Sequence, residues 1–249
     1  MRTLLAALSM LTSFPVGKNF VPTEEEIRRT PFCFPLVGIG IGLILALIGQ
    51  GILLVVPHFA AAALLTFLSE LPTLAFHLDG LADTADGFLS SRSRERILEI
   101  MHDSRIGTMG VLAIAAWSLI KFSAFAVLPE KFIPAALFFM ALNGRCAMVY
   151  HLLSSRYARA EGLGRLVFER KPVSGAVLSL LCSFGLMYAV FPPVCLIVPG
   201  AVLVFGSLWS FCTWKLIGGG TGDTLGAAEE LSEILTLLLL ICLTAENCI

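Results

Sequence analysis

Charged residues are scarce in this sequence. They make up 14% of its 249 residues, while hydrophobic residues reach 57%; an ordinary soluble domain has roughly 25% charged residues. A water-soluble fold of this length could not bury so much apolar surface. The formal net charge of -1 also excludes nucleic-acid binding by a strongly basic surface. Since no fixed-period repeat or low-complexity linker occurs, residues 1–249 are predicted to form a single domain.

Metal-binding and disulfide patterns of cysteine are absent as well. No CxxC pair occurs, and no histidine lies at the spacing of a zinc site. We interpret the seven cysteines, scattered through mostly apolar stretches, as small packing residues. Their odd number argues against a disulfide-stapled secreted protein. They are Cys33, Cys146, Cys182, Cys195, Cys212, Cys242 and Cys248.

The N-terminus lacks a clear signal-peptide cleavage site. Arg2 and the apolar run 4–11 resemble a short signal peptide, but Phe14-Pro15-Val16 follows without a small-x-small pattern. We therefore expect residues 1–14 to remain in the protein as an interfacial helix that lies on the membrane.

Long apolar runs, in contrast, are abundant. A hydrocarbon core about 30 Å thick is crossed by about 20 apolar residues in a helix, and the chain offers six or seven such runs. They cover residues 35–56, 59–78, 109–128, 132–153, 174–191, 194–214 and 231–244, the last beginning near Leu225. The sequence therefore predicts an all-α polytopic membrane bundle.

Lysine and arginine are distributed unevenly between the connections. The tight connections at Pro57-His58, 129–131 and Pro192-Pro193 contain only Lys131. The long polar loops 14–34, 79–108, 154–173 and 215–230 contain Lys18, Arg28, Arg29, Arg92, Arg94, Arg96, Arg105, Arg156, Arg159, Arg165, Arg170, Lys171 and Lys215. By the positive-inside rule the long loops are cytoplasmic, and seven spans would put the C-terminus outside.

Aspartate is rare and confined to two of these loops. The chain contains Asp79, Asp83, Asp86 and Asp103 in the second long loop and Asp223 in the fourth. In HLDGLADTADG, residues 77–87, the first three acids follow at i, i+4 and i+7, so a helix continuing from the second span would project them from one face. Their repulsion favours a cation among them, and carboxylates suit Mg²⁺ or Mn²⁺. For His77 we expect a capping or supporting role rather than ligation.

The fourth loop combines glycines with acids in the run IGGGTGDTLGAAEELSE. A glycine-rich turn entering a helix offers backbone N–H groups to an anion, which makes Gly219, Gly220 and Thr221 candidates for holding a phosphate. Asp223 and Glu230 lie seven residues apart and predict a second acidic stripe. Two such stripes at one membrane face would hold a metal-bound diphosphate between them.

Three arginines are candidates for binding phosphate oxygens, because guanidinium groups bind them bidentately. Arg105 lies beside Asp103, Arg159 lies in the third long loop, and Arg145 lies inside a predicted span, where an unpaired cation is costly. Lys121 is also within a predicted span, and the sequence leaves open whether it snorkels or has a buried partner.

These motifs resemble a known family. The segments FHLDGLADTADGFLSSRSRERILEIMHDSRIGTMGVLA and GGGTGDTLGAAEELSE, together with FPLVG at 34–38 and YARAEGLG at 157–164, are similar to those of cobalamin synthase, the adenosylcobinamide-GDP ribazoletransferase family. The resemblance covers nearly the whole chain. Arg156 stands where the family pattern has proline before the tyrosine.

The resemblance implies the final assembly step of the corrinoid coenzyme. Adenosylcobinamide-GDP would join α-ribazole, or its 5′-phosphate, and GMP would leave, with Mg²⁺ as cofactor. Asp79, Asp83, Asp86 and Asp223 would hold Mg²⁺ on the diphosphate.

Further roles follow from the same resemblance. Arg105 and Arg159 would bind diphosphate oxygens, and Asp103 or an acid of the cluster would accept the proton. The site would face the cytoplasm from a bacterial or archaeal cytoplasmic membrane. We expect the lipid bilayer as partner, no nucleic acid, and either a homo-oligomer or association with other corrinoid-pathway enzymes.

Two alternatives fit the residues less well. A prenyltransferase or CDP-alcohol phosphotransferase also uses acidic motifs on helices, but the spacing D-x3-D-x2-D followed by a distant TGD is not what we expect of either. A cation-coupled transporter would have its acids near the middle of spans, whereas these lie at predicted cytoplasmic ends.

Overall fold

The protein is helical throughout the part of the chain that the structure describes. The computed structural model describes residues 1–17, 20–162 and 164–245, and in these ranges the only β-structure is an isolated bridge between Tyr157 and Gly220. The all-α prediction is confirmed. Lys18, Leu163 of the YARAEGLG motif and Cys248 lie outside the described residues.

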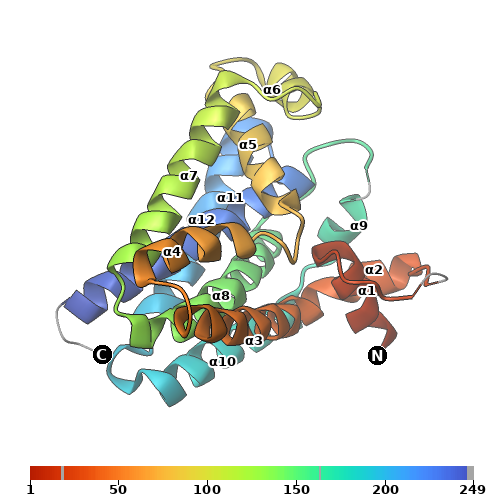
Figure 1. Cartoon of the computed structure of the whole chain (residues 1–249). Coiled ribbons are helices and arrows are strands. Elements are labelled where there is room, and N and C mark those ends of the chain that lie inside the picture. Colours follow the sequence, from red (N-terminus) through yellow and green to blue (C-terminus); the bar gives the residue numbers. More distant parts are fainter. Residues whose placement is uncertain (18–19, 163, 246–249) are drawn as a thin grey trace.

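The chain folds into α-helices joined by short 3₁₀ turns (Figure 1). The helices are α1 (Arg2–Leu11), α2 (Glu24–Arg29), α3 (Phe34–Leu53), α4 (His58–Leu68), α5 (Phe76–Phe88), α6 (Arg94–Ile100), α7 (Thr108–Val127), α8 (Ile133–Ser154), α9 (Arg165–Phe168), α10 (Val173–Val190), α11 (Ile197–Ile217) and α12 (Gly222–Ala245). The 3₁₀ turns are η1 (Thr30–Cys33), η2 (Glu130–Phe132) and η3 (Pro192–Val194).

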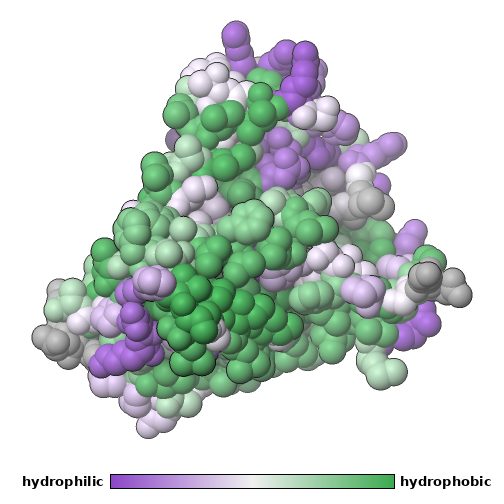
Figure 2. Space-filling model, in the orientation of Figure 1, coloured by the Kyte–Doolittle hydropathy of each residue, from purple (hydrophilic) through white to green (hydrophobic). Residues whose placement is uncertain are grey.

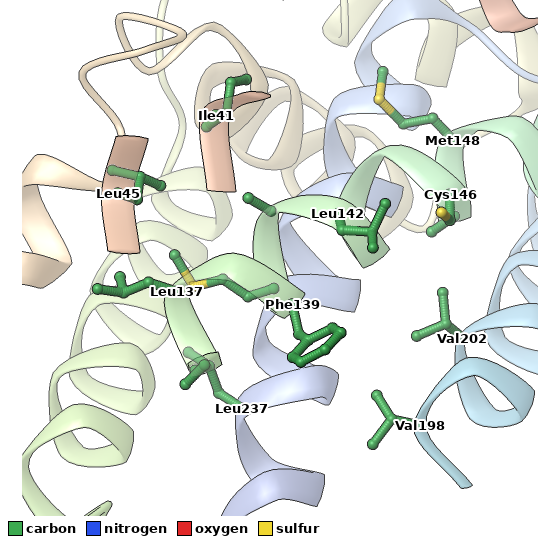
Figure 3. Close-up of a cluster of buried hydrophobic side chains, with 14 of the residues drawn as sticks. Ile41, Leu45, Leu137, Phe139, Leu142, Cys146, Met148, Val198, Val202 and Leu237 are labelled. Atoms are coloured by element: carbon green, nitrogen blue, oxygen red, sulfur yellow. The ribbon is translucent and has the colours of Figure 1, made fainter. Parts of the chain in front are cut away.

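Helix α8 is the centre of the bundle, and α3, α10, α11 and α12 all pack against it. Its side chains Leu137 and Phe139 are fully buried, and Ile41 of α3, Val202 of α11 and Leu237 of α12 belong to the same apolar cluster (Figure 3). α8 is buried on all sides because other helices surround it. It therefore fixes the position of α12, which contributes to the candidate site.

Helices α3 and α8 touch backbone to backbone. A Cβ added at Gly38 would lie 2.9 Å from the Ala141 carbonyl oxygen, and one at Gly42 would lie 2.7 Å from that of Phe138. Such close approach by small residues is typical of helix pairs in membranes, where dispersion contacts provide much of the association energy.

Five segments of the described chain are long and apolar enough to cross a membrane. They are Glu24–Leu53, Thr108–Val127, Glu130–Ser154, Val173–Val190 and Pro192–Ile217. Large apolar side chains such as Leu47, Phe59 and Leu119 are exposed on the outside of α3, α4 and α7, and Figure 2 shows a broad apolar face with polar residues gathered toward the ends of the molecule. These are the features of a multi-pass membrane protein.

The predicted span 59–78 is not one helix. α4 ends at Leu68, and α5 begins only at Phe76, after a turn in which Leu74 and Ala75 adopt left-handed φ values of 50° and 59°. Pro72 within this turn has no amide hydrogen for a helical bond. The acidic stripe therefore lies on a separate short helix rather than on a continuation of the span, which corrects the expectation from the sequence.

The last predicted span is longer than the apolar run alone. α12 begins at Gly222, so it contains Asp223 and three glutamates as well as the run 231–244. Its acidic residues keep it out of the five apolar segments, although it has 24 residues. α12 is thus a membrane-length helix that is polar in its first half.

Two smaller expectations concern the N-terminus and the cysteines. Residues 2–11 form helix α1, as predicted, and its placement at the membrane surface stays a prediction. All cysteines within the described residues are free thiols; Cys33 and Cys146 are buried in the core, whereas Cys212 and Cys242 are exposed on their helices. The packing interpretation therefore holds for the buried pair but not for the exposed ones.

Candidate active site

Helices α5 and α12 cross at two glycines. A Cβ added at Gly80 would lie 2.9 Å from the Asp223 carbonyl oxygen, and one at Gly226 would lie 2.9 Å from the His77 carbonyl oxygen. Because neither glycine has a side chain, the two backbones come into contact. This crossing brings the acidic stripe of α5 against the first turn of α12.

The crossing creates an acidic group that we call the outer carboxylate cluster: Asp79, Asp83, Asp86 and Asp223. Asp79 is exposed and the other three are half-buried. Burial, followed by the negative charges of Asp79, Asp223 and Asp86, raises the pKa of Asp83 to about 7. The four side chains therefore influence one another, as the spacing on α5 and the distant TGD motif predict.

Asp86 also holds α7 in place. Its Oδ2 accepts a hydrogen bond from the Gly107 amide at 2.7 Å, and its Oδ1 accepts one from the Gly110 amide at 2.8 Å. Both amides belong to the N-terminus of α7, where backbone donors lack partners within the helix. A carboxylate has lone pairs beyond these two bonds, so Asp86 remains available to a cation.

Arg159 contacts the outer carboxylate cluster directly. Its Nη2 lies 2.8 Å from Asp223 Oδ2, and the same nitrogen donates to the Met101 carbonyl oxygen at 3.3 Å. The Thr221 hydroxyl donates to Asp223 Oδ2 at 3.2 Å. A cation and four acids thus share one site at the start of α12.

Asp103 and Arg105 form a pair of their own at the exposed connection between α6 and α7. Arg105 Nη2 lies 2.6 Å from Asp103 Oδ2, and Arg105 holds the pKa of Asp103 at about 2. The pair lines a pocket of about 140 Å³ together with Asp86 and Arg96. Asp103 and Arg105 therefore reach the cluster through this pocket rather than by direct contact.

The glycine-rich turn before α12 does not present the open anion cradle that the sequence suggests. The Gly220 amide donates to the Arg156 carbonyl oxygen at 2.8 Å, and the Thr221 amide donates to Thr224 Oγ1 at 2.8 Å. A Cβ at Gly219 would collide with Arg156. These glycines permit close packing of the third loop, and Thr221 caps α12 by accepting from the Thr224 amide at 3.2 Å.

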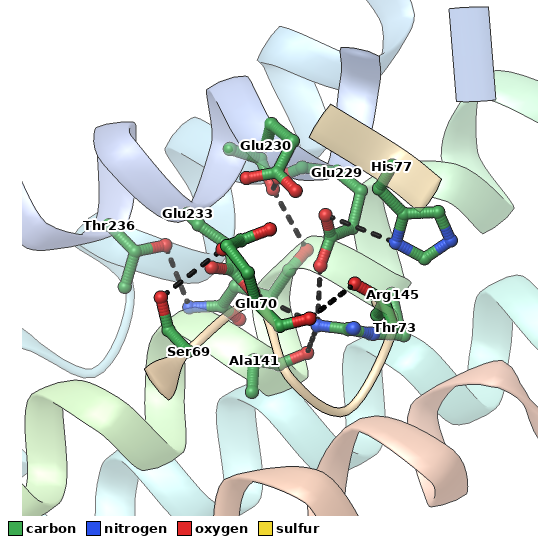
Figure 4. Close-up of polar contacts among 12 residues, drawn as sticks. Ser69, Glu70, Thr73, His77, Ala141, Arg145, Glu229, Glu230, Glu233 and Thr236 are labelled. Carbon is green, nitrogen blue, oxygen red and sulfur yellow. Dashed lines mark hydrogen bonds and ion pairs between the residues drawn. The ribbon is translucent and has the colours of Figure 1, made fainter. Parts of the chain in front are cut away.

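Three other residues that the sequence singles out for the site lie away from the outer carboxylate cluster. His77, Arg145 and Glu230 belong to a buried ion network, which we define as Glu70, His77, Lys121, Arg145, Glu229, Glu230 and Glu233 (Figure 4). Glu230 Oε2 accepts from Trp117 Nε1 at 2.7 Å. Asp223 and Glu230 thus do not share a site, because seven residues along α12 separate them by about 10 Å.

The buried ion network answers the question that the sequence leaves open for Lys121. Its ammonium group is fully buried and lies 2.7 Å from Glu233 Oε2 and 3.1 Å from Glu70 Oε1. Sequence reasoning missed Glu70 as its partner. Because a carboxylate inside the predicted span 59–78 is costly in lipid, its position in the sequence already indicated that Glu70 needs a cationic partner.

The implied Mg²⁺ suits the donor set of the outer carboxylate cluster, whose four members supply only hard oxygen ligands. Their mutual effect on the pKa of Asp83 indicates repulsion that a cation would relieve. However, within the described residues the two groups of three ligands whose atoms lie within 4.8 Å of one another belong to the buried ion network. Mg²⁺ in the outer carboxylate cluster would therefore rely on water and substrate oxygens to complete its coordination.

Comparison with known proteins identifies the family. A family model described as cobalamin-5-phosphate synthase matches residues 3–241. The chain belongs to this family. The family resemblance seen in the sequence is thereby confirmed.

Three relatives share the name adenosylcobinamide-GDP ribazoletransferase. The one from Clostridium botulinum (strain Loch Maree / Type A3) is 37% identical over 244 residues, which cover 95% of this chain and 96% of its own. The one from Pseudomonas putida (strain GB-1) is 39% identical over 244 residues, covering 96% and 98%. The one from Caldanaerobacter subterraneus subsp. tengcongensis is 35% identical over 243 residues, covering 96% and 97%. No solved structure matches the chain.

Proposed function

We propose that the chain is an adenosylcobinamide-GDP ribazoletransferase. It joins adenosylcobinamide-GDP to α-ribazole, or to its 5′-phosphate, and releases GMP. The observation that carries this proposal is the meeting of the three α5 acids with Asp223 and Arg159 at the α5–α12 crossing. It occurs in a chain whose relatives bear that name.

The reaction is a transfer of a substituted phosphoryl group. The acceptor hydroxyl attacks the phosphorus attached to cobinamide, the bond from that phosphorus to the bridging oxygen breaks, and GMP leaves with that oxygen. Mg²⁺ would supply charge neutralisation on the diphosphate. Asp79, Asp83, Asp86 and Asp223 would hold it, and Arg159 is placed to bind the oxygens that gain charge.

The proton of the attacking hydroxyl needs an acceptor, and an acid of the outer carboxylate cluster that Mg²⁺ leaves free fits better than Asp103. An efficient general base has a pKa near the working pH. Arg105 holds the pKa of Asp103 at about 2, far below that range, whereas burial and the neighbouring acids disfavour the charged form within the cluster. Asp103 and Arg105 instead line the pocket beside Asp86, where they suit binding of a polar substrate part.

We place the site at the cytoplasmic face of a bacterial or archaeal cytoplasmic membrane. The long loops that surround the outer carboxylate cluster carry most of the lysine and arginine, and such loops stay on the cytoplasmic side. A cysteine introduced at exposed Glu95 of α6 should react with an impermeant maleimide only after the cells are opened. Labelling of intact cells would place the site on the other side.

The decisive experiment measures GMP release by the purified chain in lipid. Wild-type protein should release GMP from adenosylcobinamide-GDP when α-ribazole and Mg²⁺ are present, and Asp83→Asn should release almost none. Glu95→Gln removes an exposed carboxylate from nearby α6 and serves as the matched control, with normal release expected. Normal GMP release by folded Asp83→Asn would refute the assignment of the site. Absence of release by wild type in several lipids would refute the function.

A further inference from the structure

The buried ion network contains more negative than positive charge. Its four glutamates, Glu70, Glu229, Glu230 and Glu233, are each at most 8% exposed. Among the residues that the structure describes, only two permanent cations, Lys121 and Arg145, face them. An uncompensated charge costs several kcal/mol in a low-dielectric interior. Either protons or a further cation must therefore compensate the remaining carboxylates.

The two cations occupy one side of the network. Arg145 pairs with Glu229 Oε1 and lies 2.9 Å from Glu233 Oε1. Lys121 lies between Glu70 and Glu233, and its distance to Glu230 Oε2 is longer, at 3.8 Å. Glu229 Oε2 and the Glu230 carboxylate are thus the acidic groups whose negative charge the two cations neutralise least.

His77 faces these two glutamates from α5. Its Nδ1 lies 3.3 Å from Glu229 Oε2, and Figure 4 shows the imidazole ring turned toward this carboxylate. His77 is 1% exposed, yet its Nε2 has no hydrogen-bond partner, and the contact between its Nδ1 and Glu229 Oε2 is close without meeting the geometry of a hydrogen bond. Buried polar atoms normally have partners, so these three require an explanation.

We infer that His77, Glu229 and Glu230 bind a divalent transition-metal ion. Each residue offers one ligand atom, and these atoms all lie within 4.8 Å of one another. One imidazole nitrogen with two carboxylate oxygens suits Zn²⁺ or Mn²⁺, whereas Mg²⁺ prefers oxygen ligands alone. The ion supplies two positive charges and gives a partner to Glu229 Oε2 and to one of the two ring nitrogens of His77.

The surrounding residues orient the ligands for this role. Trp117 Nε1 donates to Glu230 Oε2 at 2.7 Å, and Arg145 holds Glu229 Oε1, which leaves the other oxygen of each carboxylate for the ion. Such outer contacts fix the geometry of metal ligands. The second group of three, Glu70, Glu230 and Glu233, already has the Lys121 ammonium beside it, which disfavours another cation there.

The ion would join two helices at the base of the outer carboxylate cluster. His77 lies on α5, two residues before Asp79, while Glu229 and Glu230 lie on α12. Metal bonds between them would fasten the α5–α12 crossing that Gly80 and Gly226 permit. The site is structural and differs from the proposed Mg²⁺ site in residues and in ligand chemistry.

Metal analysis of the full chain in nanodiscs tests this inference. Protein is loaded with Zn²⁺ or Mn²⁺, transferred to buffer containing Mg²⁺, and assayed by mass spectrometry of the metal. Wild type and Asp83→Asn should both retain about one ion per chain, and His77→Ala should lose it. Retention by wild type no greater than by His77→Ala would overturn the inference, as would loss of the ion in Asp83→Asn alone.

A second measurement on unmodified protein guards against misfolding of the variant. A chelator should lower the melting temperature of the wild type in nanodiscs, and Zn²⁺ or Mn²⁺ in the presence of excess Mg²⁺ should restore it. Restoration by Mg²⁺ alone, or no response to the chelator, would overturn the inference of a transition-metal ion in the network.

Discussion

Gly80→Ala tests whether the α5–α12 crossing builds the site. The added Cβ would lie 2.9 Å from the Asp223 carbonyl oxygen and 3.0 Å from its Cα, whereas ordinary contact begins at 3.4 Å. The backbone of α12 must therefore move by about 0.5 Å. Such overpacking costs about 1–3 kcal/mol, offset by about 1 kcal/mol because alanine favours helix. A misplacement of 1 Å costs about 100-fold in rate, so we expect about a tenfold loss of GMP release.

The assay combines thermal unfolding in lipid with GMP release, using Gly40→Ala as the matched control. Gly40 also lies within a helix, but a Cβ there meets nothing within 4 Å. The control should keep full activity and be stabilised by up to about 1 kcal/mol. If Gly80→Ala matches the control in both measurements, the close contact at Asp223 does not position the acids and the reasoning is wrong.

Three further predictions concern charges. Lys121→Met leaves buried carboxylates without their cation and should lower the free energy of unfolding by about 3–5 kcal/mol, measured by thermal unfolding. Lys131→Met, at an exposed position, should change it little. Equal melting temperatures of the two variants would contradict this prediction. Burial and neighbouring acids raise the pKa of Asp83 to about 7 in the folded protein. The free energy of unfolding should therefore fall as pH rises from about 4, the unfolded pKa, to about 7. Mg²⁺ binding needs the ionised form of Asp83, so the Mg²⁺ concentration that gives half-maximal GMP release should fall as pH rises over the same range. The pH midpoint of this change should be lower in Asp79→Asn, which lacks one of the charges that raise the pKa of Asp83. A half-saturating Mg²⁺ concentration that does not depend on pH would contradict this prediction. Arg159→Ala should raise KM for the diphosphate substrate about 10- to 100-fold, since a charged hydrogen bond is lost, and an unchanged KM would refute its contact with substrate.

Hydropathy predicted the spanning helices well where the chain runs straight through apolar surroundings. The run 109–128 became α7 at Thr108–Val127, and the run 174–191 became α10 at Val173–Val190. In lipid every backbone amide needs a partner within its own segment, so length and apolarity nearly determine such helices.

The same reasoning failed for the run 59–78. Hydropathy does not report the left-handed conformations of Leu74 and Ala75, which depend on packing around the turn. Glu70 was the residue in the sequence that argued against an ordinary span, because a carboxylate in an apolar run needs a partner. Its partner, Lys121, lies 51 residues away in sequence, and no local pattern connects the two.

The candidate site was predictable in part. Helical spacing was enough to place Asp79, Asp83 and Asp86 together, because α5 is a helix although it is not continuous with the span. Spacing could not show that Glu230 points into the bundle while Asp223 lies near its surface. The burial of each residue depends on how the other helices pack around α12, which the sequence of α12 alone does not reveal. Spacing also could not show that the amides of Gly220 and Thr221 already have hydrogen-bond partners, because these partners lie in the third long loop and on α12.

The acids of α12 also constrain how the protein enters the membrane. Translocon-based scales assign about 2.5–3.5 kcal/mol to a charged residue at the centre of an inserting helix, and α12 carries Glu229, Glu230 and Glu233. Its cationic partners, Lys121 and Arg145, lie on α7 and α8, which leave the ribosome earlier. Stable insertion of α12 therefore depends on helices that are already in place.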